Sequence, residues 1–163
     1  MKRLLIVYHS MTGAAEQLAR AALEGACTET GIETRLQAAR DTVTDDLLAA
    51  DGYLFATPEN LAAMAGMMKD FFDRTYYGVL DRIQGRPYAL IIAAGTDGTN
   101  AARQVERIAT GWRLQRVAPT MIVVNGAQTP EAILAPKTVP PAELARAAEL
   151  GAALAAGLAS GIF

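Results

Sequence analysis

The sequence is poor in cysteine, histidine and net charge, and each shortage excludes a class of protein. Cys27 is the only cysteine in 163 residues, so no internal disulfide can form and a reducing, cytoplasmic location is expected. With this cysteine and one histidine, His9, the chain has too few ligands for an ordinary His/Cys metal site. The formal net charge is −2, so no strong field favours nucleic acid or an anionic membrane as a partner.

Long uncharged apolar segments are also absent. The run at residues 4–7 follows Lys2 and Arg3 as in a signal peptide, but it is too short and no small-residue cleavage site follows it. Residues 150–163 carry no charge, yet they fall short of the roughly 20 residues that a bilayer requires. We therefore expect no membrane span.

Five short apolar runs predict β-strands. They lie at residues 4–8, 34–36, 52–56, 88–94 and 120–124. The first, fourth and fifth runs are continuously apolar, which is typical of strands buried on both faces of a sheet. The second run is weak and is assigned mainly from its place between two helices.

The segments between these runs have the three-to-four-residue spacing of amphipathic helices. Four apolar stripes result: Ala15, Leu18, Ala19, Ala22 and Ala26; Met64, Met68, Phe71 and Thr75, widened by Met67 and Phe72; Ala101, Val105, Ile108 and Trp112; and Leu144, Ala148, Leu150, Leu154 and Leu158. Pro140 and Pro141 open the last of these helices.

This order of elements predicts the fold class. Strands that alternate with helices form right-handed βαβ units, so we expect an α/β fold with a three-layer, doubly wound, five-stranded parallel sheet. No composition break or internal repeat divides the chain, which predicts a single domain over residues 1–163. Residues 128–141 contain four prolines and are interpreted as an extended surface excursion.

A sheet of this kind binds ligands beyond the carboxyl ends of its strands, and the loops there exclude three classes. After the first strand, residues 10–15 read Ser-Met-Thr-Gly-Ala-Ala, whereas a dinucleotide-binding Rossmann unit requires G-x-G-x-x-G. The P-loop pattern G-x-x-x-x-G-K-[ST] occurs nowhere. A response-regulator receiver needs carboxylates at the ends of the first and third strands, where this sequence has Tyr-His-Ser and Ala-Thr-Pro.

The turn after the first strand has the chemistry of a phosphate site. It consists of Ser10, Met11, Thr12, Gly13, Ala14 and Ala15. Its hydroxyls and backbone amides lie at the start of a helix, where the dipole favours an anion without any lysine. Gly13 allows a ligand to approach closely. The alternative is that Ser10 or Thr12 only caps the first helix.

Together with two later segments, this turn resembles the flavodoxin superfamily and its NAD(P)H-dependent FMN oxidoreductases. Residues 6–13 are similar to the opening strand and phosphate loop of that superfamily. Residues 56–60 and 67–74 resemble the T-P-x-x … K-x-F-x-D-R segment of its reductases, and residues 95–99 lie at the place of a third, flavin-contacting loop. The resemblance covers residues 1–125 and implies the flavodoxin-like strand order 2-1-3-4-5.

The resemblance implies a binding site for FMN, with NAD(P)H as the reductant. Ser10, Thr12 and Gly13 would bind the FMN phosphate together with the amides of Met11, Ala14 and Ala15. Two further loops would flank the isoalloxazine ring. One is Pro58, Glu59, Asn60, Leu61, Ala62 and Ala63, and the other is Gly95, Thr96, Asp97, Gly98 and Thr99. No residue is assigned a catalytic role, because the hydride chemistry belongs to the cofactor.

The sequence departs from flavodoxins at two places. Ala14 and Ala15 stand where Asn and Thr commonly follow the glycine, so two polar donors to the phosphate are lost. The loops at 59–64 and 96–100 contain no Trp or Tyr, whereas electron-carrier flavodoxins cover the ring with aromatic residues. An open ring face suits a reductase, in which nicotinamide or a quinone stacks on the flavin.

We therefore interpret the chain as an FMN-binding oxidoreductase that passes hydride from NAD(P)H to a quinone-like or other small acceptor. A flavodoxin-like electron-transfer protein and a flavin-free domain of the same fold are the alternatives. The broad apolar face at residues 64–72 suggests a homodimer or larger homo-oligomer, although a wide core stripe explains it slightly better.

Several other residues have a functional and a structural interpretation. His9 and Cys27 are interpreted as a loop residue and a structural residue without catalytic roles. Glu59 and Asp97 either contact the substrate or flavin or serve their own turns. Arg103 and Arg107 are candidates for a nicotinamide 2′-phosphate by position only.

Overall fold

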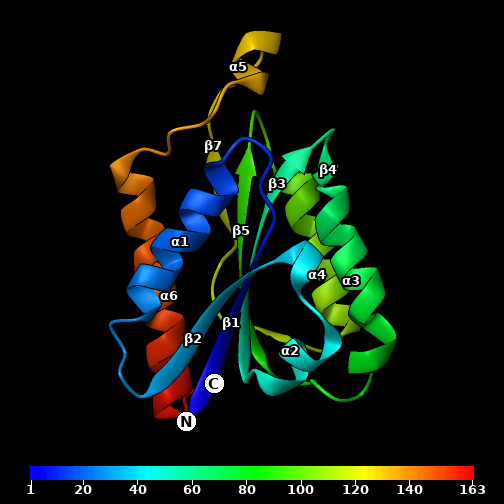
Figure 1. The fold of residues 1–163 in the computed structure, drawn as a ribbon, viewed down its shortest axis with the longest axis vertical. Coiled ribbons are helices and arrows are strands. Elements are labelled where there is room, and N and C mark those ends of the chain that lie inside the picture. Colours follow the sequence, from blue (N-terminus) through cyan, green and yellow to red (C-terminus); the bar gives the residue numbers. More distant parts are fainter.

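A parallel β-sheet crosses the centre of the molecule, with helices on both faces (Figure 1). The structure is a computed structural model that describes residues 1–163. Its main strands pair in the order β2-β1-β3-β5-β7, and every pair is parallel. These strands are β1 (Lys2–Tyr8), β2 (Ile32–Ala38), β3 (Gly52–Asn60), β5 (Pro87–Ala94) and β7 (Met121–Val124). The predicted sheet and its strand order are therefore confirmed.

The fifth strand of the prediction is interrupted in the structure. A short strand, β6 (Gln115–Arg116), pairs with the beginning of β5, and β7 pairs with the end of β5. Between them lies Pro119, which has no amide hydrogen for a ladder hydrogen bond and so favours a break at an edge strand.

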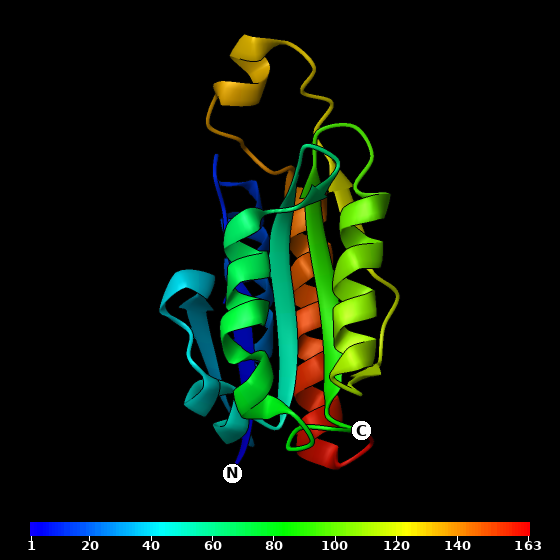
Figure 2. The same ribbon diagram turned by 90° about the vertical axis from the view of Figure 1, so that its right-hand side faces the viewer.

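Helices form the layers on either side of the sheet (Figure 2). One face of the sheet is covered by α1 (Ala14–Ala26) and α6 (Pro141–Ser160). The other is covered by α3 (Gly66–Val79) and α4 (Thr99–Gly111), with the short α2 (Thr44–Ala49) at the base. This arrangement gives the three layers that the alternation of strands and helices predicts.

Each face of the sheet has its own apolar core, because successive strand residues point to opposite faces. In β5 every residue is buried, with Leu90 and Ile92 in the core under α3 and α4. Ala89 and Ile91 lie in the core under α1 and α6. The apolar stripe predicted for the first helix is buried in full, so this periodicity located the core face correctly.

Several local predictions were wrong. Met64 lies in a two-residue strand, β4 (Ala63–Met64), and the helix that follows begins only at Gly66. The six-residue α2 was not predicted, because it is too short to show a helical repeat. Residues 128–141 are not simply extended at the surface. They contain α5 (Pro130–Leu134), and Val139 is buried in the core.

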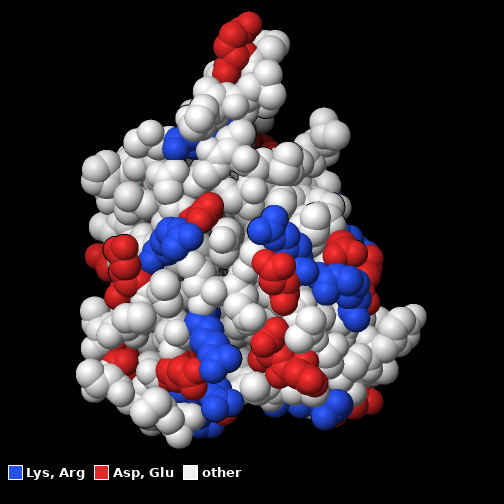
Figure 3. All heavy atoms as spheres, in the orientation of Figure 1, with Lys and Arg blue, Asp and Glu red and all other residues white.

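Acidic and basic side chains lie interspersed over the face shown in Figure 3. Several form pairs one helical turn apart, such as Arg20 with Glu16 and Arg74 with Asp70. Such exposed pairs each contribute little to stability. None of the helices is both long enough and apolar enough to cross a membrane.

Helices α1 and α6 approach so closely that two glycines are required at their crossing. A Cβ atom on Gly151 would overlap the carbonyl group of Ala22, and one on Gly25 would overlap the carbonyl group of Ala148. The obstacle in each case is backbone, which cannot rotate away as a side chain does. The two glycines therefore set the distance between these helices.

Replacing Gly151 by alanine should destabilise the protein by about 1–3 kcal/mol, because the helices must separate and loosen the core beneath them. Gly111→Ala is the matched control, since an added Cβ at this helical position meets nothing within 4 Å. We expect the control to leave stability unchanged or raise it slightly. Urea denaturation measures both, and equal midpoints would contradict the close helix crossing.

Candidate functional site

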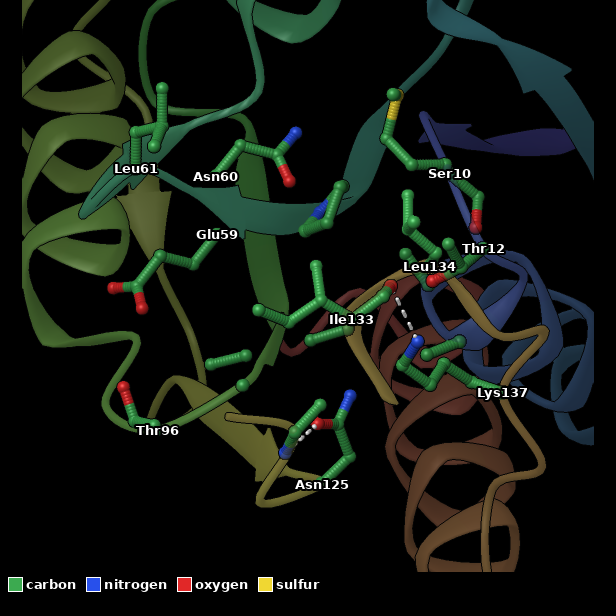
Figure 4. A pocket seen from close by; sticks show the side chains of 18 of the residues that line it. Ser10, Thr12, Glu59, Asn60, Leu61, Thr96, Asn125, Ile133, Leu134 and Lys137 are labelled. Atoms are coloured by element: carbon green, nitrogen blue, oxygen red, sulfur yellow. Dashed lines mark hydrogen bonds between the residues drawn. The ribbon is translucent and has the colours of Figure 1, made fainter. Parts of the chain in front are cut away.

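A cleft of about 450 Å³ opens at the carboxyl ends of the strands (Figure 4). It lies beside the neighbouring strands β1 and β3. The chain continues from β1 to β2 on one side of this pair and from β3 to β5 on the other, and ligands commonly bind at such a point in open α/β sheets. The residues that line it are Ser10, Met11, Thr12, Ala14, Ala15, Pro58, Glu59, Asn60, Leu61, Ala62, Ala93, Ala94, Gly95, Thr96, Asn125, Ala127, Ile133, Leu134 and Lys137.

The structure brings the three predicted loops together around this one cleft. Most of the residues proposed from the sequence contribute to its walls. The exceptions are Gly13, Ala63, Asp97, Gly98 and Thr99, which do not line it. Gly13 and Gly98 instead shape the loops. Each is the residue before a helix and has a positive φ, 101° for Gly13 and 86° for Gly98.

The turn after β1 combines an internal hydrogen bond with free donors. The amide of Gly13 donates to Ser10 Oγ at 3.1 Å, and the hydroxyl hydrogen of Ser10 can still donate elsewhere. No side chain caps α1, so the alternative in which Ser10 or Thr12 only caps the helix is not what the structure shows. The amides of Met11, Thr12, Ala14 and Ala15 have no acceptor within the chain. The amides of Ala14 and Ala15 are donors that the start of a helix leaves unpaired, and those of Met11 and Thr12 belong to the loop before it. Their grouping beside the cleft fits a phosphate such as that of FMN.

A strained hairpin forms the second wall. Glu59 pairs with Met64 and Asn60 with Ala63, which leaves a two-residue turn of Leu61 and Ala62. Their φ values are 51° and 62°, a left-handed conformation that usually requires Gly or Asn. Hydrogen bonds from α4 anchor this turn.

Two contacts make this anchor. Asn100 Nδ2 donates to the carbonyl oxygen of Ala62 at 2.6 Å, and the amide of Met64 donates to Gln104 Oε1 at 2.9 Å. Strained backbone persists where surrounding contacts hold it, and it is common at ligand-binding loops. The hairpin is therefore shaped before any ligand arrives.

The two carboxylates that the sequence placed near the ring have different roles. Glu59 lines the cleft, and its Oε2 accepts a hydrogen bond of 2.8 Å from the amide of Gly98 at the start of α4. This bond ties the hairpin to the loop at residues 95–99, which forms the third wall, and it is favoured by the helix dipole. Asp97 accepts from the amide and hydroxyl of Thr99, at 3.4 and 2.8 Å, and so stabilises its own turn outside the cleft.

A fourth wall was missed by the sequence analysis. It comes from the segment after β7 and includes Asn125, Ile133, Leu134 and Lys137. The prolines in this segment suggested a surface excursion, and no periodicity pointed back to the cleft. Ile133 and Leu134 add apolar surface, and no aromatic ring is among the lining residues, whose only charged members are Glu59 and Lys137.

His9 and Cys27 lie outside the cleft. The His9 ring is half-buried, and its Nε2 is 3.4 Å from the sulfur of Met11. Burial, with a smaller effect from the charge of Arg40, lowers the pKa of His9 below 6.5. Cys27 is exposed at the end of α1.

A doubly wound sheet of this strand order, with its ligand cleft at the first turn, makes the chain a flavodoxin-type α/β protein. Within that class it belongs to the family of NADPH-dependent FMN reductases, whose family model matches residues 4–129. This match confirms the resemblance that the three loop segments suggested.

Individual relatives agree with this assignment. The chain is 36% identical over 95 residues to an NAD(P)H dehydrogenase (quinone) of Acidithiobacillus ferrooxidans, covering 46% of this chain and 48% of that one. It spans about half the length of the curated relatives it matches.

Solved structures agree on the fold. A WrbA-like flavodoxin from Agrobacterium tumefaciens superposes with a TM-score of 0.78 at 19% identity, over 99% of each chain. An archaeal flavodoxin superposes with a TM-score of 0.79 at 17% identity, over 96% of this chain and 98% of that one.

The lowered pKa of His9 predicts a pH dependence of stability. The folded protein favours the neutral form of the His9 ring. The contribution of this ring to folding stability is therefore fully present above the ordinary pKa of 6.5 and is lost as the pH falls toward the lower folded-state pKa. Between about pH 7.5 and 5.5, wild type should lose more unfolding free energy in urea titrations than His9→Gln. Equal losses in the two proteins would show that His9 titrates normally.

Proposed function

We propose that this protein is an FMN-dependent oxidoreductase that takes hydride from NAD(P)H and passes electrons to a quinone or a similar small acceptor. The family match supports the cofactor and the reductant. The observation that carries the proposal is a cleft with free amides at one end and no aromatic side chain in its walls. A flavin held there keeps room for a second substrate on its ring.

Each wall has a part in this proposal. The amides of Met11, Thr12, Ala14 and Ala15 would hold the FMN phosphate, and the hydroxyl of Thr12 would add a further donor.

The hairpin at Leu61 and the loop at Thr96 would flank the ring, with their separation maintained by the bond between Glu59 and Gly98. FMN supplies the hydride chemistry when it is bound.

The aliphatic residues of the fourth wall would exclude water from the ring. Ile133 and Leu134 lie in the cleft beside the turn after β1, as Figure 4 shows. Both side chains are largely exposed, which makes apolar surface available to a ring or to a quinone.

Anaerobic mixing of the FMN-loaded protein with NADPH or NADH tests the proposal. We expect the nucleotide to bleach the visible flavin absorbance and the absorbance to return when a quinone is added. Bound flavin that neither nucleotide bleaches would indicate an electron carrier. Protein that binds no FMN, and gains no thermal stability from it, would indicate a flavin-free domain.

We further propose a homodimer or larger homo-oligomer and a cytoplasmic location. Most of the broad apolar face at residues 64–72 is buried, but α3 leaves Met67 and Tyr77 exposed, and Leu61 is fully exposed at the mouth of the cleft. The single cysteine, which is unpaired, supports a reducing compartment. Light scattering should give at least twice the mass of one chain, and the mass of a single chain would contradict the oligomer.

A further inference from the structure

One basic side chain reaches the cleft, and it comes from a segment far from the phosphate turn in sequence. Lys137 is the only lysine or arginine among the lining residues. Figure 4 shows it on the same side as Ser10 and Thr12, with Glu59 on the opposite side. Its charge therefore lies at the end of the cleft where the unpaired amides of the turn are found.

The backbone of Lys137 is fixed to this turn by hydrogen bonds. Its amide donates to the carbonyl oxygen of Thr12 at 2.8 Å. Its carbonyl oxygen accepts a bond of 2.7 Å from Gln17 Nε2, which also donates to the carbonyl oxygen of Gly13 at 3.0 Å. The amide of Val139 donates to Gln17 Oε1 at 3.1 Å. Gln17 thus joins residues 137–139 to the beginning of α1.

The ammonium group of Lys137 has no acidic partner. Its Nζ donates to the carbonyl oxygens of Ile133 and Ala135, at 2.9 and 2.6 Å, and it takes part in none of the ion pairs of the chain. An ammonium group has three donors, so one is free. A phosphate would offer stronger, charge-assisted bonds than these neutral carbonyls.

We propose that Lys137 binds the phosphate of FMN and replaces the polar donors that are missing at Ala14 and Ala15. This inference rests on the proposed function, because it assumes that FMN occupies the cleft. The anchored backbone places the flexible side chain beside the turn, and the lack of a carboxylate leaves its charge for the ligand. The site then has a cation even though the phosphate turn itself contains none.

The preference for FMN over riboflavin isolates the phosphate contribution, because riboflavin has the same ring and no phosphate. Dissociation constants for both flavins are measured by quenching of flavin fluorescence. Lys137→Met removes the charge and keeps most of the apolar stem. We expect it to lower the FMN preference about tenfold or more, to leave riboflavin binding unchanged, and to flatten the salt dependence of FMN binding. Lys137→Arg should retain most of the preference.

A matched control separates charge from disturbance of α5, which Lys137 also contacts. Thr129 Oγ1 accepts a bond of 3.2 Å from the amide of Ala132 and caps α5. Thr129→Val loosens this helix without removing the charge, so it should leave the FMN preference unchanged. An equal loss of preference in Thr129→Val and Lys137→Met would overturn the proposal.

The remaining outcomes are also decisive. Wild-type protein that binds neither flavin would refute the proposed function, and this inference with it. Wild-type protein that binds FMN with the same preference and salt dependence as Lys137→Met would refute the inference alone. An unchanged FMN preference with a raised KM for NADPH would assign Lys137 to the phosphates of the nicotinamide nucleotide and would also overturn the proposal.

Discussion

Burial of the central strands on both faces determines where this protein can bind a ligand. All eight residues of β5 are buried, and so are the four from Leu4 to Val7 in β1. The backbone groups of these strands are used in the sheet. Free polar groups therefore occur where strands end and helices begin. Gly13 and Gly98 make two of these turns possible, because both have the positive φ that glycine adopts without strain.

The loops at this edge are tied to one another before any ligand is present. Glu59 joins the β3 loop to the start of α4, and Asn100 joins α4 to the hairpin turn. Gln17 joins α1 to the segment at residues 137–139. A cleft that is already shaped loses little conformational entropy on binding. It can therefore hold a cofactor with backbone amides and few side-chain donors.

The sequence was sufficient for the sheet, the strand order and the cleft's first three loops, because strand hydrophobicity and helix periodicity are local signals. It was insufficient where contacts join distant residues. The contacts of Lys137 with Thr12 and Gln17 have no local pattern. The turn at Leu61 and Ala62 was not predicted either, because it lacks the Asn-Gly or Gly signal of such hairpins. For Asp97 the sequence left open a contact with the flavin or a role in its own turn, and the structure shows Asp97 hydrogen-bonded within that turn.

The flavin site that we propose extends from the turn after β1 at one end to the loop at Thr96 at the other. Amide chemical shifts in a ¹H–¹⁵N spectrum, recorded as FMN is added, test it most directly. We expect the largest shifts at Met11, Thr12, Ala14, Ala15 and Thr96, with small changes at the base of the sheet. Shifts confined to other surfaces, or a saturating change that leaves the turn after β1 unaffected, would contradict the account.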